Sequence, residues 1–259
     1  MTAPLAMPVE VVAVREVTPA MLRITVRGDG LRGFAPEGGD QWLRLFLPLP
    51  GQVEPVLPTS VDWWPEVCRI PEAVRPIVRS YSVRAVRPEA AELDIDVVRH
   101  GQSGPGTRWA GHVVPGDRLG LLDQSTTYAP PAGTPWQLLL ADESALPALG
   151  SIVEGLPGGT PAIAYAEVPT ADDVQELTSA AALTVHWLAR QPGDAVGIAL
   201  LAALQQATLP PGTPYVWVAG EQRMVRQTRR HLVGERGYPR AAVCFMSYWR
   251  RGKRADDVD

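Results

Sequence analysis

Apolar residues in the first half of the chain fall into short runs that are rich in β-branched residues and partly alternate with polar positions. Such runs predict β-strands, because successive side chains of a strand point to opposite faces of a sheet. Proline and other turn-forming residues separate the runs. Several short strands divided by turns are typical of a small antiparallel β-barrel. We expect its strands at residues 9–17, 21–27, 41–47, 79–86 and 92–99.

A proline-rich stretch, residues 48–76, interrupts this pattern and shows no periodicity. Structureless loops of that length are uncommon in compact domains. We therefore expect a short helix around residues 61–68, inside a segment that forms a rim or lid.

The pattern changes after residues 129–135, where proline, glycine and alanine indicate a linker. Continuous apolar runs follow, which are typical of strands buried in a parallel sheet. Helical stretches alternate with these runs, and this alternation predicts a doubly wound α/β fold. The expected strands are residues 136–141, 161–167, 183–188 and 215–219, and the expected helices are residues 145–154, 172–177, 196–208 and 224–236. The chain should therefore form two domains, residues 1–130 and 131–259.

Composition is that of a soluble globular protein, with 46% hydrophobic and 20% charged residues. The net charge of -4 gives no reason to expect a nucleic-acid partner. No apolar run reaches the roughly 20 residues that cross a bilayer, and the N-terminus lacks the pattern of a signal peptide. We therefore expect a cytoplasmic protein with no membrane partner.

Cysteine and histidine are sparse and show no metal-ligand spacing, so we expect neither a disulfide framework nor a metal site. Among the 24 basic residues only Lys253 is a lysine. Any basic pocket must therefore be built mainly from arginines, whose guanidinium groups favour bidentate contacts with anions.

The run from Arg79 to Arg84 carries the first chemical signal. In an extended strand Arg79 and Tyr81 share one face, and Ser82 lies on the other. A flavin needs a cation for its phosphate, a flat aromatic surface for its ring and a small hydroxyl near its redox-active nitrogen. The run can supply all three. The alternative is an ordinary barrel strand with exposed arginines.

A glycine-rich turn follows at residues 100–106 and leads into a short helix that begins near Gly106. Glycines let the backbone approach a ligand closely, and the free N–H groups at the start of a helix attract pyrophosphate. Thr107 adds a hydroxyl donor. A plain turn is the alternative reading, but the two motifs together favour a flavin with a pyrophosphate, which is FAD rather than FMN.

The second half offers a nicotinamide site, because residues 141–148 follow the first parallel strand, where dinucleotide folds bind phosphate. A G-x-G-x-x-G motif is absent there, and Asp142 would repel phosphate unless it turns away and caps a helix. Residues 167–173 are acidic, whereas Arg190 is the one cation after the third strand. This balance favours NADH over NADPH.

The chain resembles the siderophore-interacting protein family, the FAD-dependent reductases of ferric siderophores. A barrel followed by a parallel sheet is also the plan of the ferredoxin-reductase type of flavoenzyme. Two departures stand out, a serine at position 82 where the family usually has threonine, and the scarcity of lysine for a siderophore pocket. The resemblance is carried by RSYSVR (79–84), LDIDVVRHGQSGPGTRWA (93–110), PGDRLGL (115–121), LLLADESALPA (138–148), HWLAR (186–190), YVWVAGE (215–221) and SYWRRG (247–252).

The resemblance implies that Tyr81 packs on the flavin ring, that Ser82 donates toward the flavin N5, and that these two residues serve catalysis. Arg79 would contact the FAD phosphate. The other expected cofactor contacts are His100, Gly101, Gly104, Pro105, Gly106, Thr107, Trp109, Asp142, Ser144, Ala145, Gly220, Glu221, Tyr248 and Trp249. For the ferric siderophore we expect contacts from Arg250, Arg251 and Lys253, with Arg254 beside them.

The activity implied is electron transfer from NADH or NADPH through FAD to the Fe(III) of a siderophore, in a monomer. Two alternatives stay open: a flavin-dependent reductase of another acceptor, for instance a redox protein or free flavin, and a siderophore-binding protein without a working cofactor site. A redox protein could also replace the nicotinamide as electron donor.

Overall fold

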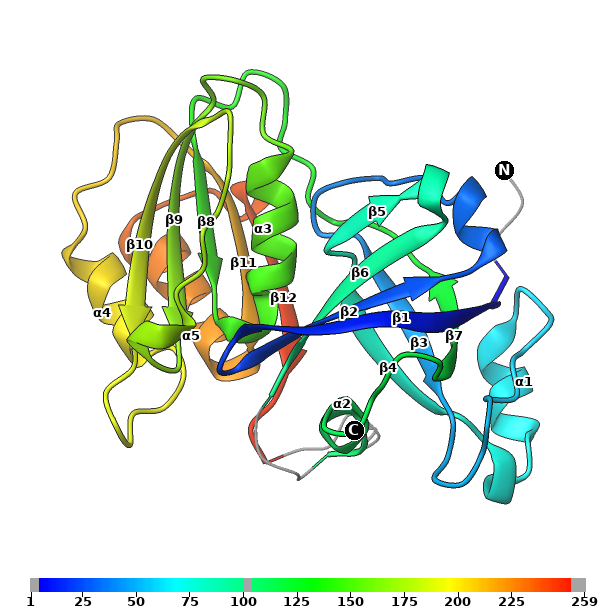
Figure 1. The fold of residues 1–259 in the computed structure, drawn as a ribbon. Helices are drawn as coiled ribbons and strands as arrows, with labels where there is room; N and C mark the ends of the chain where they lie inside the picture. The colour runs from blue at the N-terminus through cyan, green and yellow to red at the C-terminus, as the bar shows by residue number, and fades with distance from the viewer. Residues whose placement is uncertain (1–4, 100–103, 253–259) are drawn as a thin grey trace. The chain divides into compact units, whose positions relative to one another are not determined.

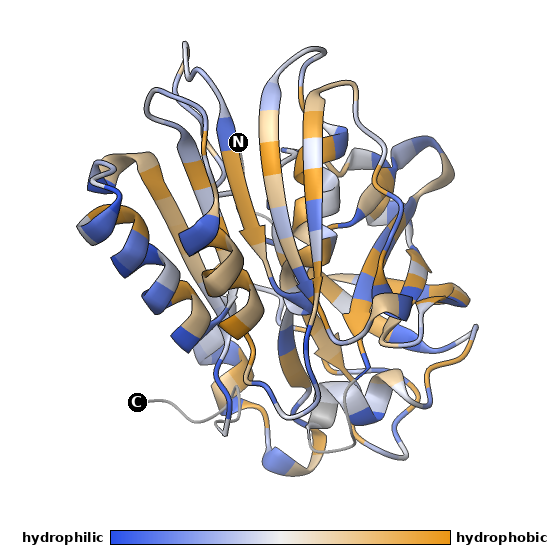
Figure 2. Cartoon of the chain, turned by 90° about the vertical axis from the view of Figure 1, so that its left-hand side faces the viewer, coloured by the Kyte–Doolittle hydropathy of each residue, from blue (hydrophilic) through white to orange (hydrophobic). Residues whose placement is uncertain are grey.

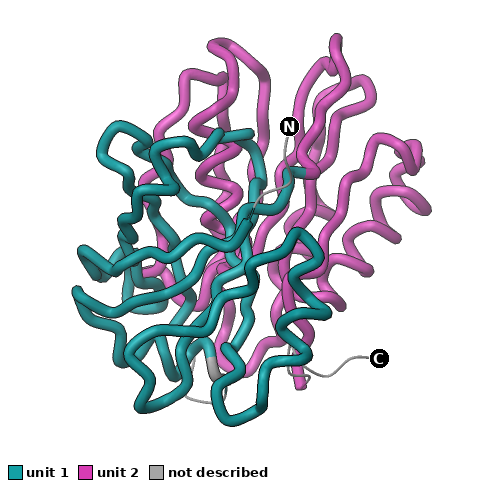
Figure 3. The backbone as a smooth tube through the Cα atoms, turned by 90° about the vertical axis from the view of Figure 1, so that its right-hand side faces the viewer, with its two compact units in different colours: residues 1–126 teal, residues 127–259 magenta. Residues whose placement is uncertain are grey.

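The computed structural model describes residues 5–99 and 104–252. The chain divides into two compact units, residues 1–126 and 127–259 (Figure 3). The sequence placed the division at residue 130. Each unit has its own sheet and its own hydrophobic core.

Unit 1 contains seven strands in the order β4-β3-β7-β1-β2-β6-β5, and every neighbouring pair is antiparallel. Only Val83 and Arg84 separate the two edge strands, so the edges of the sheet must meet. The Arg84 N–H donates to the Asp94 carbonyl at 2.9 Å at this junction. This is the predicted antiparallel barrel. Its strands are β1 (Met7–Thr18), β2 (Met21–Arg27), β3 (Trp42–Leu47), β4 (Ile77–Ser82), β5 (Ala85–Arg87), β6 (Glu92–Val98) and β7 (Arg118–Asp123).

The barrel core follows from the alternation in the sequence. Ile24 pairs with Ile95 and Val26 with Leu93 across β2 and β6, and all four side chains are fully buried. β-branched side chains fit such a pleated, packed surface. The intervening positions of β6 carry Asp94 and another acid, which face away from this apolar layer.

The proline-rich stretch contains helix α1 (Trp63–Arg69), as predicted, and a short 3₁₀ turn at Glu72–Val74. Trp63 packs edge-to-face against Phe46 of β3, with 5.8 Å between the ring centroids. The single strand expected at residues 79–86 is wrong, because the chain bends at Val83 and Arg84 and forms β4 and β5 instead. Helix α2 (Pro105–Ala110) follows the glycine-rich turn.

Unit 2 contains five parallel strands in the order β10-β9-β8-β11-β12 (Figure 1). The order reverses between β8 and β11, and α3 lies on one side of the sheet while α4 and α5 lie on the other, so the predicted doubly wound plan is confirmed. Hydrophobic residues lie along much of the length of these strands (Figure 2). The elements are β8 (Gln137–Ala141), α3 (Leu146–Glu154), β9 (Pro161–Val168), β10 (Ala182–Ala189), α4 (Ile198–Gln206), β11 (Tyr215–Glu221), α5 (Gln222–Arg230) and β12 (Val243–Trp249).

Two expected helices of unit 2 differ from the structure. The helix at 172–177 is wrong: Thr170 and Asp173 form a capping box that closes a single 3₁₀ turn, and the backbone is extended from Val174 onward. The helix expected at 224–236 begins at Gln222 and becomes π-helical over His231–Glu235.

Candidate functional site

In unit 1 the structure brings the arginine–tyrosine strand and the glycine-rich turn together. Gly106, in the first turn of α2, lies directly against β4. A Cβ at this position would stand 3.0 Å from the Tyr81 hydroxyl and 3.5 Å from Arg79 Cγ. Because glycine has no Cβ, the backbone of α2 can approach these two side chains closely. The two motifs that the sequence singled out therefore form one structural site.

The side chains of β4 alternate as predicted. Burial raises the pKa of Tyr81 to about 12, so its phenol stays neutral and keeps its hydrogen-bond donor at physiological pH. Ser82 is buried at the end of the strand. Ser80, on the opposite face from Arg79 and Tyr81, is exposed and accepts a hydrogen bond from Arg44 Nη1 at 2.6 Å.

The turn before α2 is described in part. Gly104 is extended and precedes Pro105, the first helical residue, and its carbonyl accepts from the Arg108 N–H at 2.9 Å. Trp109, an expected cofactor contact, is partly buried and packs against the barrel core. His100 and Gly101 lie outside the described residues.

Sequence reasoning missed an ion-pair network beside this site. Asp96 in β6 accepts two hydrogen bonds from Arg23, at 2.6 and 2.7 Å, and lies 3.7 Å from Arg84 Nε. Arg84 is thus held at the junction of β4 and β5 by a fully buried carboxylate. The signal was present in β6, where two acids alternate with buried aliphatic residues.

In unit 2 a buried carboxylate lies at the point where the strand order reverses. Asp142 follows β8 and is fully buried. Its Oδ1 accepts from Ser144 N at 2.9 Å and Ser144 Oγ at 2.5 Å, while Oδ2 accepts from Glu221 N at 2.7 Å and Trp249 Nε1 at 3.1 Å. Asp142 therefore turns inward, caps the turn at Glu143–Ala145 and joins the ends of β8, β11 and β12.

The electrostatics of Asp142 reflect this position. Burial raises its pKa to about 6, and the neighbouring Glu143 carboxylate adds to the rise, whereas the hydrogen bonds from Ser144, Glu221 and Trp249 oppose it. Four donors on one buried carboxylate identify a residue that holds the site together.

Gly220 and Glu221, expected beside the nicotinamide, shape the end of β11. Gly220 has φ +140°, and a Cβ there would stand 2.5 Å from Asp142 Cγ. Glu221 caps α5, because its Oε2 accepts from the N–H groups of Arg223 and Met224 at 2.6 and 3.0 Å. Ser144 and Ala145 lie in the turn that Asp142 caps.

Two of the acids that favoured NADH are engaged in hydrogen bonds within unit 2, whereas Asp172 is exposed. Glu167 is fully buried and accepts from the N–H groups of Gly197 and Leu200 at 2.8 and 2.9 Å. Asp173 is buried in its capping box. Arg190 forms a two-pronged ion pair with Glu143, at 2.6 and 2.7 Å. The preference for NADH stays a prediction.

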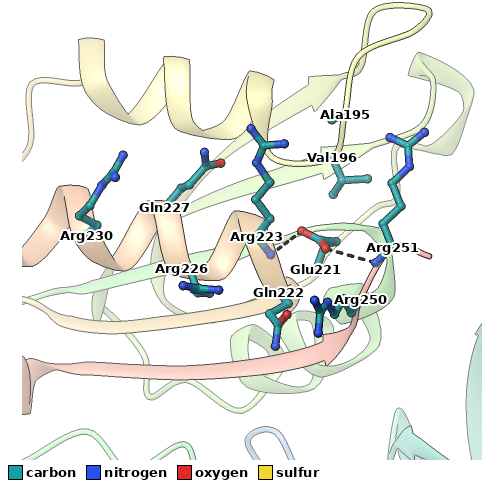
Figure 4. A pocket seen from close by; sticks show the side chains of 10 residues that line it. All are labelled: Ala195, Val196, Glu221, Gln222, Arg223, Arg226, Gln227, Arg230, Arg250 and Arg251. Atoms are coloured by element: carbon teal, nitrogen blue, oxygen red, sulfur yellow. Dashed lines mark hydrogen bonds between the residues drawn. The ribbon is translucent and has the colours of Figure 1, made fainter. Parts of the chain in front are cut away.

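A cavity of about 580 Å³ lies beside α5 (Figure 4). We call it the arginine cavity. The predicted substrate residues Arg250 and Arg251 line it. Sequence reasoning missed the arginines of α5, although their spacing of three and four residues along the chain is visible in the sequence. Lys253 and Arg254 lie outside the described residues. Among the described residues the arginines of the cavity are Arg223, Arg226, Arg230, Arg250 and Arg251.

Within residues 5–99 and 104–252, His, Cys, Asp and Glu form no cluster that could hold a metal ion. Every helix in those ranges is too short or too polar to cross a membrane.

Two family models match almost the whole chain. Residues 10–127 match the siderophore-interacting FAD-binding domain, and residues 134–252 match the siderophore-interacting protein domain. Ferric vibriobactin reductase ViuB of Vibrio cholerae is 30% identical over 247 residues, which cover 93% of this chain and 88% of that protein. The NADPH-dependent ferric-chelate reductase of Escherichia coli is 28% identical, with coverage of 92% and 91%.

Solved structures agree with this assignment. A siderophore utilization protein from T. fusca superposes with a TM-score of 0.83 at 36% identity, covering 98% of this chain and 95% of that chain. The ferredoxin reductase in carbazole 1,9a-dioxygenase superposes with a TM-score of 0.66 at 20% identity, over 94% of this chain and 69% of that chain. The second likeness concerns the fold alone and confirms the predicted ferredoxin-reductase-like architecture.

Proposed function

This chain belongs to the siderophore-interacting protein family, and from that premise we propose that it is an FAD-dependent reductase of ferric siderophores. Electrons would come from NADH or NADPH and pass to the Fe(III) of the chelate. One observation carries the proposal: Gly106 lies against Tyr81 and Arg79, within the region that matches an FAD-binding family model. A strand that suits a flavin and a turn that suits a pyrophosphate are thereby parts of one site.

The residues of unit 1 fit FAD by their chemistry. The Arg79 guanidinium offers a charge-assisted contact to a phosphate. Tyr81, neutral and partly buried, offers a flat surface and a donor, and the Ser82 hydroxyl is the donor assigned to the flavin N5. Gly104, Pro105, Gly106 and Thr107 would border the pyrophosphate. When bound, FAD supplies the ability to accept two electrons from a nicotinamide and to release them singly.

The residues of unit 2 fit a nicotinamide cofactor at the carboxyl ends of the parallel strands, where open α/β sheets bind ligands. Ser144 offers a hydroxyl at the start of the turn that leads into α3. Asp142 positions that turn, and Gly220 permits the close approach of Asp142. Tyr248 and Trp249 end β12, and by the family resemblance this aromatic pair is assigned to covering the flavin or stacking at the entrance of its site.

The substrate is a chelated ferric ion, so the protein needs no iron ligands of its own. Anionic siderophores would be recognised by Arg250 and Arg251, with Lys253 following in the sequence. Reduction releases the iron because hard oxygen donors hold Fe(II) less tightly than Fe(III). We place this reaction in the cytoplasm and assign it to a monomer.

Two measurements test the proposal. First, flavin extracted from the purified protein should chromatograph as FAD, and recovery of FMN alone would contradict the assigned pyrophosphate site. Second, a panel of ferric siderophores should stimulate NAD(P)H oxidation, with Fe(II) trapped by a chromogenic chelator.

The same assay separates the alternatives. Oxidation that depends on free flavin or a redox protein, and not on any siderophore, would favour a reductase of another acceptor. A colourless protein that binds siderophores without oxidising NAD(P)H would favour a non-catalytic binding protein.

A further inference from the structure

The sequence of α5 places three arginines on one side of a short helix. Met224, Val225 and Thr228 are buried against the sheet. Arg223, Arg226 and Arg230 are exposed, and their spacing of three and four residues puts them on a common face. Figure 4 shows these side chains along one wall of the arginine cavity.

The other walls come from segments that follow parallel strands. Ala195 and Val196 lie in the connection from β10 to α4, and Arg250 and Arg251 follow β12. The cavity is therefore at the carboxyl end of the sheet, beside segments that follow β10, β11 and β12. Its volume of about 580 Å³ is within the range of about 300–1,000 Å³ that small-molecule sites occupy.

The charge of the cavity is strongly positive although the whole chain carries -4. Glu221 is the one carboxylate among the described lining residues. Its Oε2 accepts from the N–H groups of Arg223 and Met224, and its Oε1 accepts from the Arg251 N–H at 3.3 Å. Glu221 is therefore occupied by backbone N–H groups and contributes one negative charge against the five guanidinium groups of the described lining residues.

The arginines of α5 also differ from Arg190, the cation that the sequence suggested for a 2′-phosphate, in their ion pairs. Arg190 is held by Glu143 and lies 3.4 Å from Glu167. In contrast, Arg223, Arg226 and Arg230 form no ion pair with a carboxylate in the part of the chain that the structure describes. A cation without a carboxylate partner can bind an incoming anion without first breaking an internal pair.

We infer that the α5 wall of the arginine cavity binds the 2′-phosphate on the adenosine ribose of NADPH, with Arg223 and Arg226 as specificity-determining residues, so that this chain uses NADPH in preference to NADH. Dinucleotide folds bind their ligand at the carboxyl ends of the strands, and a nearby arginine accommodates a 2′-phosphate. Guanidinium groups match its planar oxygen pairs in bidentate geometry. The inference rests on the proposed function and names its electron donor.

The decisive test is equilibrium binding, which does not depend on turnover. Isothermal titration of the flavin-loaded protein should show that adenosine 2′,5′-bisphosphate binds at least about tenfold more tightly than AMP, since each charge-assisted hydrogen bond contributes about 1.5–3 kcal/mol. Arg223→Gln and Arg226→Gln should each remove most of this difference. Arg15→Gln, an exposed arginine of β1 with the same loss of charge, should leave it unchanged. Equal binding of the two nucleotides by the unaltered protein would overturn the inference.

A kinetic arm separates the cofactor from an anionic siderophore, which could also use these arginines. With one ferric siderophore, the ratio of kcat/KM for NADPH to that for NADH should fall about tenfold in Arg223→Gln. If instead the ratio holds and only the KM for an anionic ferric siderophore rises, the cavity belongs to the substrate and the inference is wrong. Arginine-dependent nucleotide binding in a protein that reduces no ferric siderophore would support the inference and contradict the proposed function.

Discussion

The indole N–H of Trp249 donates to the buried carboxylate of Asp142, with 3.1 Å between Nε1 and Oδ2. This bond ties the last residue of β12 to the turn after β8, across the intervening strand β11. The same oxygen accepts from the Glu221 N–H. Asp142 thus fixes three segments at the point where the strand order reverses, which is where ligands bind in open α/β sheets.

Replacement of Asp142 by asparagine should weaken this junction. The amide keeps one acceptor oxygen, but its NH₂ group would face two donors on the other side. We expect the free energy of unfolding at pH 7 to fall by about 1–3 kcal/mol, the cost of unsatisfied buried donors. Urea unfolding followed by tryptophan fluorescence measures this. The control Asp172→Asn, at an exposed position in the turn after β9, should change it by less than about 0.5 kcal/mol, and equal effects would contradict the role of Asp142.

The raised pKa of Asp142 predicts a specific pH dependence. Between its ordinary value of 3.8 and about 6, the folded protein binds more protons at this site than the unfolded chain does. The part of the stability that is linked to protonation of Asp142 is therefore fully present below pH 4 and is lost as the pH rises to about 6. The difference in unfolding free energy between the unaltered protein and Asp142→Asn should change over this window. A constant difference would mean that the pKa is not raised.

Gly220 should tolerate no side chain. Alanine there would adopt φ +140° and place its Cβ 2.5 Å from Asp142 Cγ. The backbone strain costs about 1–3 kcal/mol, and the displaced carboxylate adds to it. Gly237→Ala is the matched control, because its φ is +72° and nothing lies within 4 Å of the added Cβ. Thermal unfolding should show a clearly larger loss of stability for Gly220→Ala. Similar losses in the two variants would mean that backbone strain alone explains the effect and that the contact with Asp142 contributes nothing.

Strands could be predicted from the sequence where burial leaves a regular pattern, and two were missed for identifiable reasons. In β12, Phe245 and Ser247 are exposed, so this edge strand lacks the continuous apolar run of β11. In β7, Gly120 interrupts the pattern because Leu57 occupies the space a side chain would need, 2.1 Å from a built Cβ. Glycine within a strand often marks such a close approach.

The residues of the candidate site also differ in whether the sequence alone could assign them. Arg79 and Tyr81 could be assigned because local alternation fixes their common face. The role of Asp142 could not, because its donors Glu221 and Trp249 lie 79 and 107 residues away in the sequence. A carboxylate that caps a turn and one that binds a ligand look alike until the fold brings their partners together.

Gly106→Ala should separate flavin binding from stability. Alanine favours the helical conformation of α2 over glycine by about 1 kcal/mol. Its Cβ would, however, crowd the Tyr81 hydroxyl at 3.0 Å and Arg79 Cγ at 3.5 Å. We expect flavin affinity to fall by the equivalent of about 1–3 kcal/mol, as for other overpacked sites, with no loss of stability in the flavin-free protein.

Fluorescence titration of the flavin-free protein measures that affinity. Gly111→Ala, at the end of the same helix, is the control, because its Cβ would make only ordinary contacts at 3.5 Å or more. Full flavin affinity in Gly106→Ala would show that the close approach of α2 to β4 is not needed for the cofactor.

Arg190 should matter for stability and not for cofactor choice. Its side chain is 13% exposed and that of its partner Glu143 is 11% exposed, so the pair is largely removed from water. Arg190→Met leaves a buried carboxylate beside Asp142 without its cation, which costs about 3–5 kcal/mol. Replacing both partners, Arg190→Met with Glu143→Leu, removes the stranded charge and should restore most of the stability. Charge neutralisation of the exposed pair Arg99–Glu16 should cost no more than about 1 kcal/mol.

Urea unfolding measures the free energy of unfolding of all these variants, and kcat/KM for NADPH and NADH is measured in parallel. If Arg190→Met abolished a preference for NADPH, its guanidinium would have to leave Glu143 to reach the cofactor, and the arginine cavity would lose its assigned role.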